Sequence, residues 1–456
     1  MAETISLRTR SIHPSFKTIL VSRWPQLIVQ SLLLAAFLFT ILAGWFGTPV
    51  GNHNFSIVFL WIAWWAFLIL IAVPIFGRGW CSICPIPLPG EWLQRGRVLV
   101  PQAANSSDRQ TNRFPLFNRA RWPKALRNIW LQNGAFLLLA LFSPVILTTP
   151  GITSWVLFAM LLVAIGVSLL FARRTFCRYL CPVSGFIGLY SQASPVELRI
   201  RSKKTCAACV GKPCYNGSSD GYGCPWDVFP AGMTKNTNCG LCMECLRTCP
   251  HENISVNLRS FSGDLDQPLT RLDEAFKGFI MLGSAMIYSA VLLGPWGQLK
   301  NLAYGVFEPG WFGYAVVFLA IILVLLPAVF MGFLRFDPNL PFTRATFTAF
   351  STSLLPLGLM FWVAFSLSFL LSNGSYISMV FSDPLGWGWD VFGTASIEWM
   401  PLAQSLLQPL QGLALAGGLI WSAKISTGLA RARAVSPAPV ILFGVVATFV
   451  MSWLLI

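Results

Sequence analysis

Nine apolar stretches of about twenty residues, almost free of charge, constrain the fold of this chain more than any other feature. A run of about 18 or more apolar residues is long enough to cross a bilayer as a helix. Only 11% of the 456 residues are charged, whereas about 25% is typical of soluble domains. The sequence therefore predicts an all-α polytopic membrane protein with about nine transmembrane helices. The predicted spans are about 25–47, 55–76, 128–147, 155–172, 278–296, 311–334, 346–371, 410–430 and 438–456.

The basic residues predict how these spans are oriented. The formal net charge is +15, and almost all of the 32 Lys and Arg residues fall on one side when the N-terminus is placed in the cytoplasm. This is the positive-inside bias of membrane proteins. The basic balance therefore indicates topology and contact with anionic lipids, and no nucleic-acid partner is expected.

The cysteines follow the same orientation. All twelve lie on the predicted cytoplasmic side, where thiols stay reduced and are available as metal ligands. We therefore expect a multi-pass protein of the bacterial cytoplasmic (inner) membrane, with its N-terminus and its cysteine-rich segment in the cytoplasm.

The strongest chemical motif is a run of four cysteines that ends in Cys249-Pro250. Its pattern is C-x2-C-x2-C-x3-C-P, the run with which bacterial ferredoxins hold a [4Fe–4S] cluster. A zinc site would need pairs of ligands separated by a longer loop. The run therefore predicts an iron–sulfur cluster. Its cysteines are Cys239, Cys242, Cys245 and Cys249.

A second and less regular set of cysteines precedes this run, and it ends in Cys224-Pro225. In two-cluster ferredoxins the fourth cysteine of each run binds the other cluster. Applied here, this rule predicts two [4Fe–4S] clusters. The first would be held by Cys206, Cys209, Cys214 and Cys249, and the second by Cys239, Cys242, Cys245 and Cys224. The alternative is that the irregular set is degenerate, empty or occupied by zinc.

The remaining four cysteines form two pairs at predicted cytoplasmic helix ends. The pairs are Cys81/Cys84 and Cys177/Cys181, and in each unit an Arg, an aromatic residue and the first cysteine precede Cys-Pro. We interpret the two units as an internal repeat. The pairs could form a third redox or metal site, act as a dithiol, or pack as small buried hydrophobic residues. Nearby arginines are expected to favour the thiolate form; they are Arg78, Arg173, Arg174 and Arg178.

Other cofactors have no visible site in the sequence. Paired membrane histidines, a covalent flavin site, a G-x-G-x-x-G turn and a Walker loop are all absent, so no haem, flavin or nucleotide site is expected. The predicted organisation has four parts. They are a cytoplasmic basic arm (1–24), two repeated helix hairpins that each end in a Cys-Pro pair (25–190), a cytoplasmic two-cluster ferredoxin-like α+β domain (191–277) and a five-helix membrane domain of unknown role (278–456).

Taken together, these motifs resemble the NapH/NosR-type membrane polyferredoxin family of 4Fe–4S binding integral membrane proteins. The resemblance covers about 25–255 and is carried by the two Cys-Pro pairs and the two ferredoxin-type sets. It implies quinol oxidation at the membrane and electron passage through two clusters toward a reductase or a metalloenzyme assembly system. Two features depart from the family pattern: the first pair has two intervening residues instead of three, and five unmatched spans follow.

The sequence thus favours an electron-transfer component that connects the membrane quinone pool with a partner redox protein, with quinol oxidation as its possible activity. Two alternatives stay open. One is an accessory factor for metalloenzyme assembly or metal reduction, in which the Cys81–Cys181 group would be the working site. The other is a transporter whose clusters sense redox state.

Overall fold

The computed structural model describes residues 10–11, 14–96, 98 and 121–455, with side chains from residue 17 onward. The chain divides into two compact units that alternate along the sequence. The first unit comprises residues 1–38, 72–129 and 158–264, and the second comprises 39–71, 130–157 and 265–456. Residues 1–9 and 12–13 of the predicted basic arm (1–24) lie outside the described residues.

Eight helices in the described residues are long and apolar enough to cross a membrane. They span Trp24–Phe46, Phe55–Ile83, Pro150–Leu170, Leu272–Leu293, Pro309–Leu334, Arg344–Asn373, Gln404–Arg431 and Ala438–Leu455. Each coincides with one predicted span. The predicted stretch 128–147 differs, because it folds as α7 (Trp130–Leu141) followed by the short α8 (Ser143–Ile146). Pro144 cannot donate a backbone hydrogen bond to the preceding turn, which accounts for the interruption.

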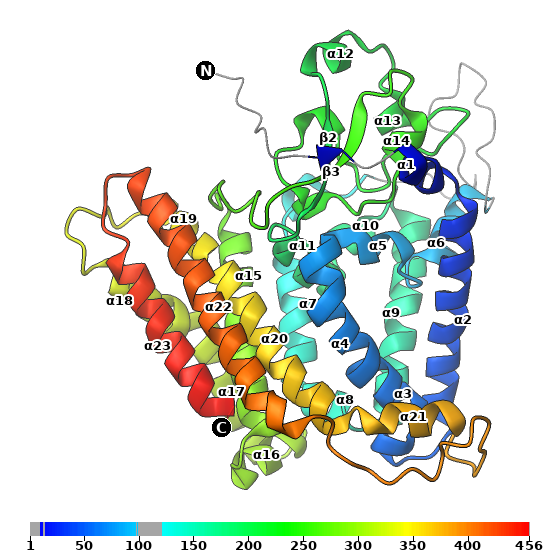
Figure 1. Ribbon diagram of the computed structural model, residues 1–456, viewed down its shortest axis with the longest axis vertical. Coiled ribbons are helices and arrows are strands. Elements are labelled where there is room, and N and C mark those ends of the chain that lie inside the picture. The colour runs from blue at the N-terminus through cyan, green and yellow to red at the C-terminus, as the bar shows by residue number, and fades with distance from the viewer. Residues whose placement is uncertain (1–9, 12–13, 97, 99–120, 456) are drawn as a thin grey trace. The chain divides into compact units, whose positions relative to one another are not determined.

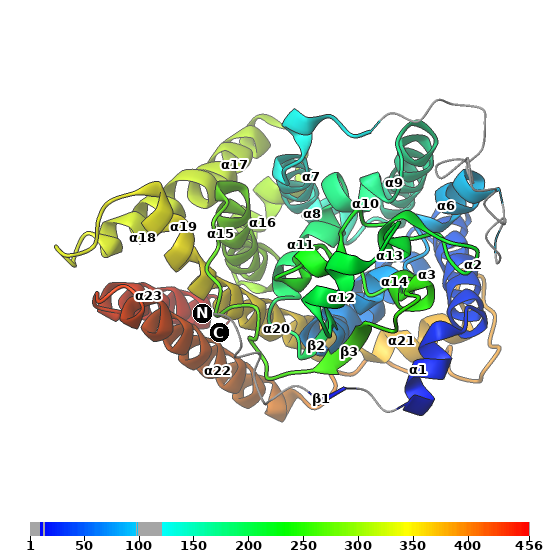
Figure 2. The same ribbon diagram turned by 90° about the horizontal axis from the view of Figure 1, so that it is seen from above.

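The first unit carries a small antiparallel sheet with the strand order β1-β3-β2. β2 (Val196–Ile200) pairs with β3 (Ile254–Leu258), so that Val196 lies opposite Leu258. Three short helices lie between these strands in sequence: α12 (Lys203–Ala208), α13 (Pro213–Asn216) and α14 (Glu244–Thr248). Figures 1 and 2 show them gathered around the sheet. Leu198, Leu246 and Val256 form a hydrophobic core here together with two of the cysteines.

The other elements of the first unit are short. They are β1 (Arg10–Ser11), α1 (Pro14–Val21), η4 (Gly77–Gly79), α5 (Trp80–Ile83), α6 (Leu88–Arg95), η5 (Lys124–Leu126), α10 (Thr175–Tyr179), α11 (Pro182–Tyr190), η6 (Pro230–Gly232) and η7 (Asn236–Asn238). Helices α2 (Trp24–Phe46), η3 (Leu68–Phe76) and α9 (Pro150–Leu170) have residues in both units.

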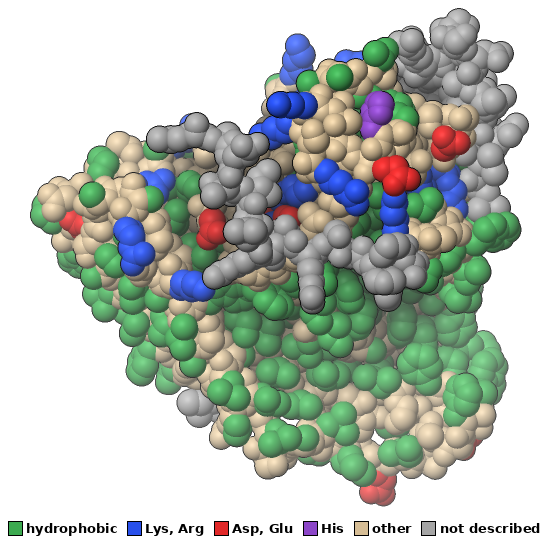
Figure 3. Space-filling view, turned by 45° about the horizontal axis from the view of Figure 1, so that its top comes forward, with side chains coloured by type: hydrophobic (Ala, Val, Ile, Leu, Met, Phe, Trp, Pro, Cys, Tyr) green, Lys and Arg blue, Asp and Glu red, His purple; other side chains and the backbone are tan. Residues whose placement is uncertain are grey.

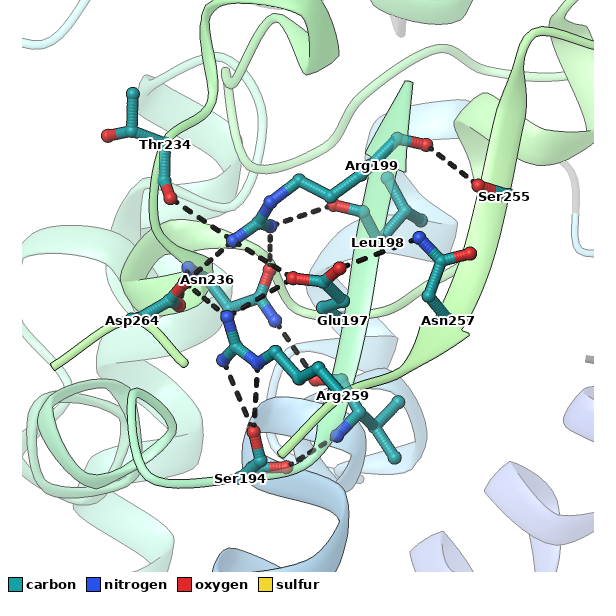
Figure 4. A network of polar contacts seen from close by, with 11 residues as sticks. Ser194, Glu197, Leu198, Arg199, Thr234, Asn236, Ser255, Asn257, Arg259 and Asp264 are labelled. Carbon is teal, nitrogen blue, oxygen red and sulfur yellow. Dashed lines mark hydrogen bonds and ion pairs between the residues drawn. The ribbon is translucent and has the colours of Figure 1, made fainter. Parts of the chain in front are cut away.

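A buried ionic network fixes the sheet to the loop that precedes the tight cysteine run (Figure 4). Arg199 and Arg259 both contact the carboxylate of Asp264, which is 2% exposed. The other carboxylate oxygen of Asp264 accepts a hydrogen bond of 2.6 Å from the backbone N–H of Asn236. Because these groups satisfy one another, the network holds the chain rigidly just before Cys239.

The second unit is built from long helices with an aromatic core. The rings of Phe279 and Phe347 stack at 5.4 Å, and the buried Trp362 donates a hydrogen bond of 2.9 Å to the carbonyl of Met281. Hydrophobic side chains cover the visible sides of the long helices in Figure 3. Leu413 is 70% exposed and Phe449 is 73% exposed, as expected for side chains that face lipid.

The remaining helices belong to the second unit. They are η1 (Gly51–His53), α3 (Phe55–Ile57), η2 (Val58–Trp64), α4 (Trp65–Phe67), α7, α8, α15 (Leu272–Tyr288), η8 (Ser289–Leu293), α16 (Gly297–Tyr304), α17 (Pro309–Ala320), η9 (Ile321–Leu325), α18 (Leu326–Leu334), α19 (Arg344–Phe350), η10 (Ser351–Ser353), α20 (Leu354–Asn373), α21 (Ser375–Ser382), α22 (Gln404–Arg431) and α23 (Ala438–Leu455).

Candidate iron–sulfur site

All twelve cysteines are free thiols in the first unit, and they gather in three sets of four. The outer set is Cys206, Cys209, Cys214 and Cys249. The inner set is Cys224, Cys239, Cys242 and Cys245. The membrane-edge set is Cys81, Cys84, Cys177 and Cys181. These are the groups of four that the sequence predicts as sets of ligands.

The outer set lines one cavity together with Pro213 and Asn253. Burial, together with the neighbouring thiols of Cys249, Cys206 and Cys209, raises the pKa of the Cys214 thiol to about 11. Asn253 lies against two of the sulfurs. Its side-chain amide donates to Cys206 Sγ at 3.0 Å, and its backbone N–H donates to Cys249 Sγ at 3.3 Å.

The inner set is held by the tight run and by one cysteine from the irregular set. Burial, with a smaller contribution from the Cys224 thiol, raises the pKa of Cys239 to about 11 and that of Cys242 to about 12. Leu241 and Met243 adopt positive φ angles of 48° and 62°. Such strained conformations in non-glycine residues persist only where the surroundings hold them, and here they wind the loop between the cysteines.

The donor chemistry of these two sets fits a [4Fe–4S] cluster better than a single metal ion. No three His, Cys, Asp or Glu side chains in the described part of the chain converge closely enough to hold one ion. In a cubane each thiolate binds a different iron, so the four sulfurs stand apart around the cluster. Since the free thiols have raised pKa values, metal binding must displace their protons.

The membrane-edge set draws on both halves of the repeat. Cys81 ends the second long apolar helix, Cys84 follows it, Cys177 lies in α10, and Cys181 caps α11. Burial raises the pKa of Cys84, and the thiols of Cys81 and Cys181 raise it further, so the two pairs lie together. Cys81, Cys177 and Cys181 are only 6–7% exposed.

The arginines around this set act against the effect of burial on the thiols. Burial raises the pKa of Cys177 well above its ordinary value and that of Cys181 to about 11, so burial outweighs the arginines. Arg174 at Cys177 and Arg78 at Cys181 do favour the thiolate, as expected, but burial has the larger effect at both residues. Removing a thiolate from water can cost more than a nearby cation offsets, and at Cys177 the nearby Arg174 is already paired with Glu91.

Three of the four arginines are ion-paired. Arg174 contacts the carboxylate of Glu91 through two nitrogens, one of them at 2.9 Å, and also donates to the carbonyl of Cys81 at 2.7 Å. Arg173 and Arg178 lie 3.0 and 3.8 Å from the carboxylate of Asp227. The sequence carried no signal for Glu91 as the partner of Arg174, because it lies on α6 and 83 residues separate the two along the chain.

Comparisons with known proteins point to the same chemistry. Residues 57–101 and 153–204 match the 4Fe-4S binding domain family Fer4_5. Each matched segment contains one pair of the membrane-edge set, and both end before Cys206. With the eight long apolar helices, these matches describe a multi-pass membrane protein that carries a 4Fe–4S binding domain.

A shorter stretch is similar to a curated protein. Over 83 residues the chain is 35% identical to the "Putative electron transport protein YccM" of Escherichia coli (strain K12). The aligned stretch covers 18% of this chain and 21% of that protein, so the likeness is local. No solved structure matches the chain.

Proposed function

We propose that the protein is a membrane iron–sulfur electron-transfer protein that binds one [4Fe–4S] cluster in the outer set and one in the inner set. The observation that carries this proposal is the crossed arrangement, in which Cys249 joins the outer set and Cys224 joins the inner set. This is the ligand exchange of two-cluster ferredoxins, and it lies between two antiparallel strands, which favours a ferredoxin-like α+β domain. A bound cubane exchanges single electrons with little rearrangement.

The membrane-edge set is proposed as a third redox or metal centre. It consists of four buried thiols, and the segments similar to the 4Fe–4S binding domain surround it. Electrostatic contacts suggest the order of the three sets. The Cys245 thiol of the inner set interacts with Cys214 of the outer set, and Arg174 interacts with both Cys177 and Cys242. The inner set therefore lies between the other two.

We propose that electrons pass between membrane quinone and a partner redox protein, as the resemblance to the NapH/NosR-type family implies. The membrane-edge set supports the quinone end, since Cys81 belongs to a helix that can cross the bilayer. The outer set supports the partner end, since Cys206 and Cys209 are partly exposed. The cytoplasmic orientation, the bacterial inner membrane and a ninth crossing through α7 and α8 belong to the same proposal.

The second unit contains a cavity that suits an apolar redox ligand. Its volume is about 340 Å³, which lies within the range of roughly 300–1,000 Å³ for small-molecule sites. Phe276, Met331 and Phe347 form apolar walls, and Arg335 and Arg344 lie at its rim. Apolar walls with a few polar groups are the usual lining of such sites.

The accessory-factor alternative is less well supported. In that role the membrane-edge set would have to reach a metal or thiol carried by another protein. Three of its four cysteines are 6–7% exposed, so a bulky partner has little access to their sulfurs.

Iron and sulfide content, measured together with low-temperature EPR of the reduced protein, tests the proposal. Two cubanes predict about eight iron and eight sulfide per chain, and a third predicts about twelve. Fewer than about eight would contradict the two-cluster reading. Substituting Cys242→Ser should remove the inner signal, whereas Cys209→Ser should remove the outer one.

The quinone step needs a separate measurement. In membranes, a reduced quinone analogue should bleach the cluster absorbance that dithionite also bleaches, and the Cys242→Ser variant serves as the control for the inner cluster. If dithionite bleaches the clusters and the quinol never does at matched potential, the quinone step is wrong.

A further inference from the structure

Arg78 is a buried cation with two unused hydrogen-bond donors. Its side chain is 3% exposed, and its Nη2 donates to the carbonyl of Ser184 at 2.8 Å. Its Nε and Nη1 have no hydrogen-bond partner among the residues that the structure describes. Leaving buried charged donors unsatisfied is costly, so such groups call for an explanation. A ligand that accepts from them would supply it.

The fold fits closely around this guanidinium. A Cβ atom at Gly188 would lie 1.9 Å from Nη2 and 2.6 Å from Cζ, so only glycine leaves room for Arg78 at this point of α11. On the other side, the guanidinium carbon lies 4.7 Å from the ring centre of Trp226. The close packing at Gly188 therefore holds the Arg78 side chain in place, and the contact with the Trp226 ring stabilises its positive charge.

The same stack continues into the loop that carries the inner set. Trp226 is 1% exposed, and a Cβ atom at Gly240 would lie 2.0 Å from its Nε1. Gly240 stands between Cys239 and Cys242 in the tight run. A continuous column of contacts thus joins Gly188, Arg78, Trp226 and the cysteine loop.

The charge of Arg78 acts on two of the three cysteine sets. Burial raises the pKa of Cys181 in the membrane-edge set and of Cys239 in the inner set to about 11, and Arg78 opposes burial at both. It also interacts with the thiols of Cys81 and Cys177. In the described part of the chain, the groups that interact electrostatically with Arg78 are the cysteines Cys81, Cys177, Cys181 and Cys239. The electrostatic effect of Arg78 therefore falls mainly on the cysteine sulfurs.

We propose that Arg78 is a positioning residue that raises the reduction potential of the centres held by the inner and membrane-edge sets. A fixed cation stabilises the more negative, reduced form of a nearby centre, and hydrogen bonds to its sulfurs act in the same direction. Nε and Nη1 are the donors available for those hydrogen bonds. The inference rests on the proposed iron–sulfur function. It adds the residue that tunes the reduction potentials of two of the three centres.

The test is a redox titration followed by EPR on the full-length Arg78→Gln variant. We expect the equilibrium constant for reduction of the inner centre to fall at least tenfold, which is 59 mV for a one-electron couple. The outer centre should change less than threefold. Arg78→Lys keeps the charge, so it should retain more of the wild-type potential than Arg78→Gln does.

The matched control is Arg201→Gln, which removes an exposed arginine from the same domain. If Arg78→Gln retains wild-type iron content and shifts the inner centre no more than Arg201→Gln does, the inference is wrong. If Arg78→Gln does not fold, Gly188→Ala displaces the guanidinium without removing it and should also lower the inner potential; an unchanged potential there overturns the inference. A wild-type protein that binds no iron would instead overturn the proposed function.

Discussion

Arg78 and Arg174 stand at the same position of the two repeat units, three residues before the first cysteine of each pair. Both are buried, at 3% and 5% exposure, yet their surroundings differ. Arg174 is neutralised by Glu91. Arg78 instead packs against Gly188 and Trp226, and two of its nitrogens, Nε and Nη1, have no hydrogen-bond partner among the described residues. One arginine therefore serves as part of a structural ion pair, and the other is left to act electrostatically on the sulfurs. A sequence repeat does not guarantee a repeated role.

The largest expected effect comes from Glu91→Gln, which would make Arg174 resemble Arg78. Removing one partner of a buried ion pair leaves an uncompensated charge and typically costs about 3–5 kcal/mol. We expect a loss of this size in the free energy of unfolding, measured by denaturant unfolding in detergent. A loss below about 1 kcal/mol would show that other groups compensate Arg174.

Gly188→Ala tests the surroundings of Arg78, because the added methyl group would occupy the space that the guanidinium fills. Overpacking at a well-packed position costs about 1–3 kcal/mol. The control is Gly166→Ala on α9, where a Cβ atom would meet nothing within 4 Å. In a helix that substitution should be neutral or stabilising by up to about 1 kcal/mol. Equal thermal stability of the two variants would contradict the close contact between Gly188 and Arg78.

Asp227→Asn probes the arginines that face solvent. Arg173 and Arg178 share this carboxylate, which is 42% exposed, so screening by water limits what the pairs contribute. Exposed ion pairs typically contribute about 0.2–1 kcal/mol. We expect a loss in that range, and a further decrease of the effect at high salt. A loss as large as that of Glu91→Gln would show that burial does not separate the two kinds of pair.

The smallest expected effect concerns pH. Burial opposes ionisation of Glu91, but Arg174 and Arg95 outweigh burial and lower the pKa of the carboxyl below its ordinary value. A depressed pKa means that the stabilisation is fully present above the ordinary value of about 4.3 and is lost as the pH falls through the folded pKa. The stability difference between wild type and Glu91→Gln should therefore be the same at pH 8 and pH 6. A difference that shrinks over this interval would contradict the depressed pKa.

Much of the architecture was predictable because it depends on short-range patterns. Apolar runs of bilayer length predicted the positions of all eight long helices. Cysteine spacing also predicts which thiols would share a centre, since three cysteines spaced as in Cys239–Cys245 have few ways to wrap one cluster. The interruption at Pro144 was less visible, because one proline inside an apolar stretch still permits a kinked helix.

Only the tertiary structure decided which residues surround the cysteines. Trp226 follows the Cys224-Pro225 motif, and Arg78 precedes the first cysteine pair by three residues. Nothing in either local sequence indicates that the two side chains stack on each other. Glu91 likewise reaches Arg174 across more than eighty residues of sequence. Hydrophobic period and ligand spacing act within one segment and can be seen in the sequence. The partner of a buried charge depends on how distant segments pack, so the sequence determined the three cysteine sets while the fold determined which arginine was left to act on them.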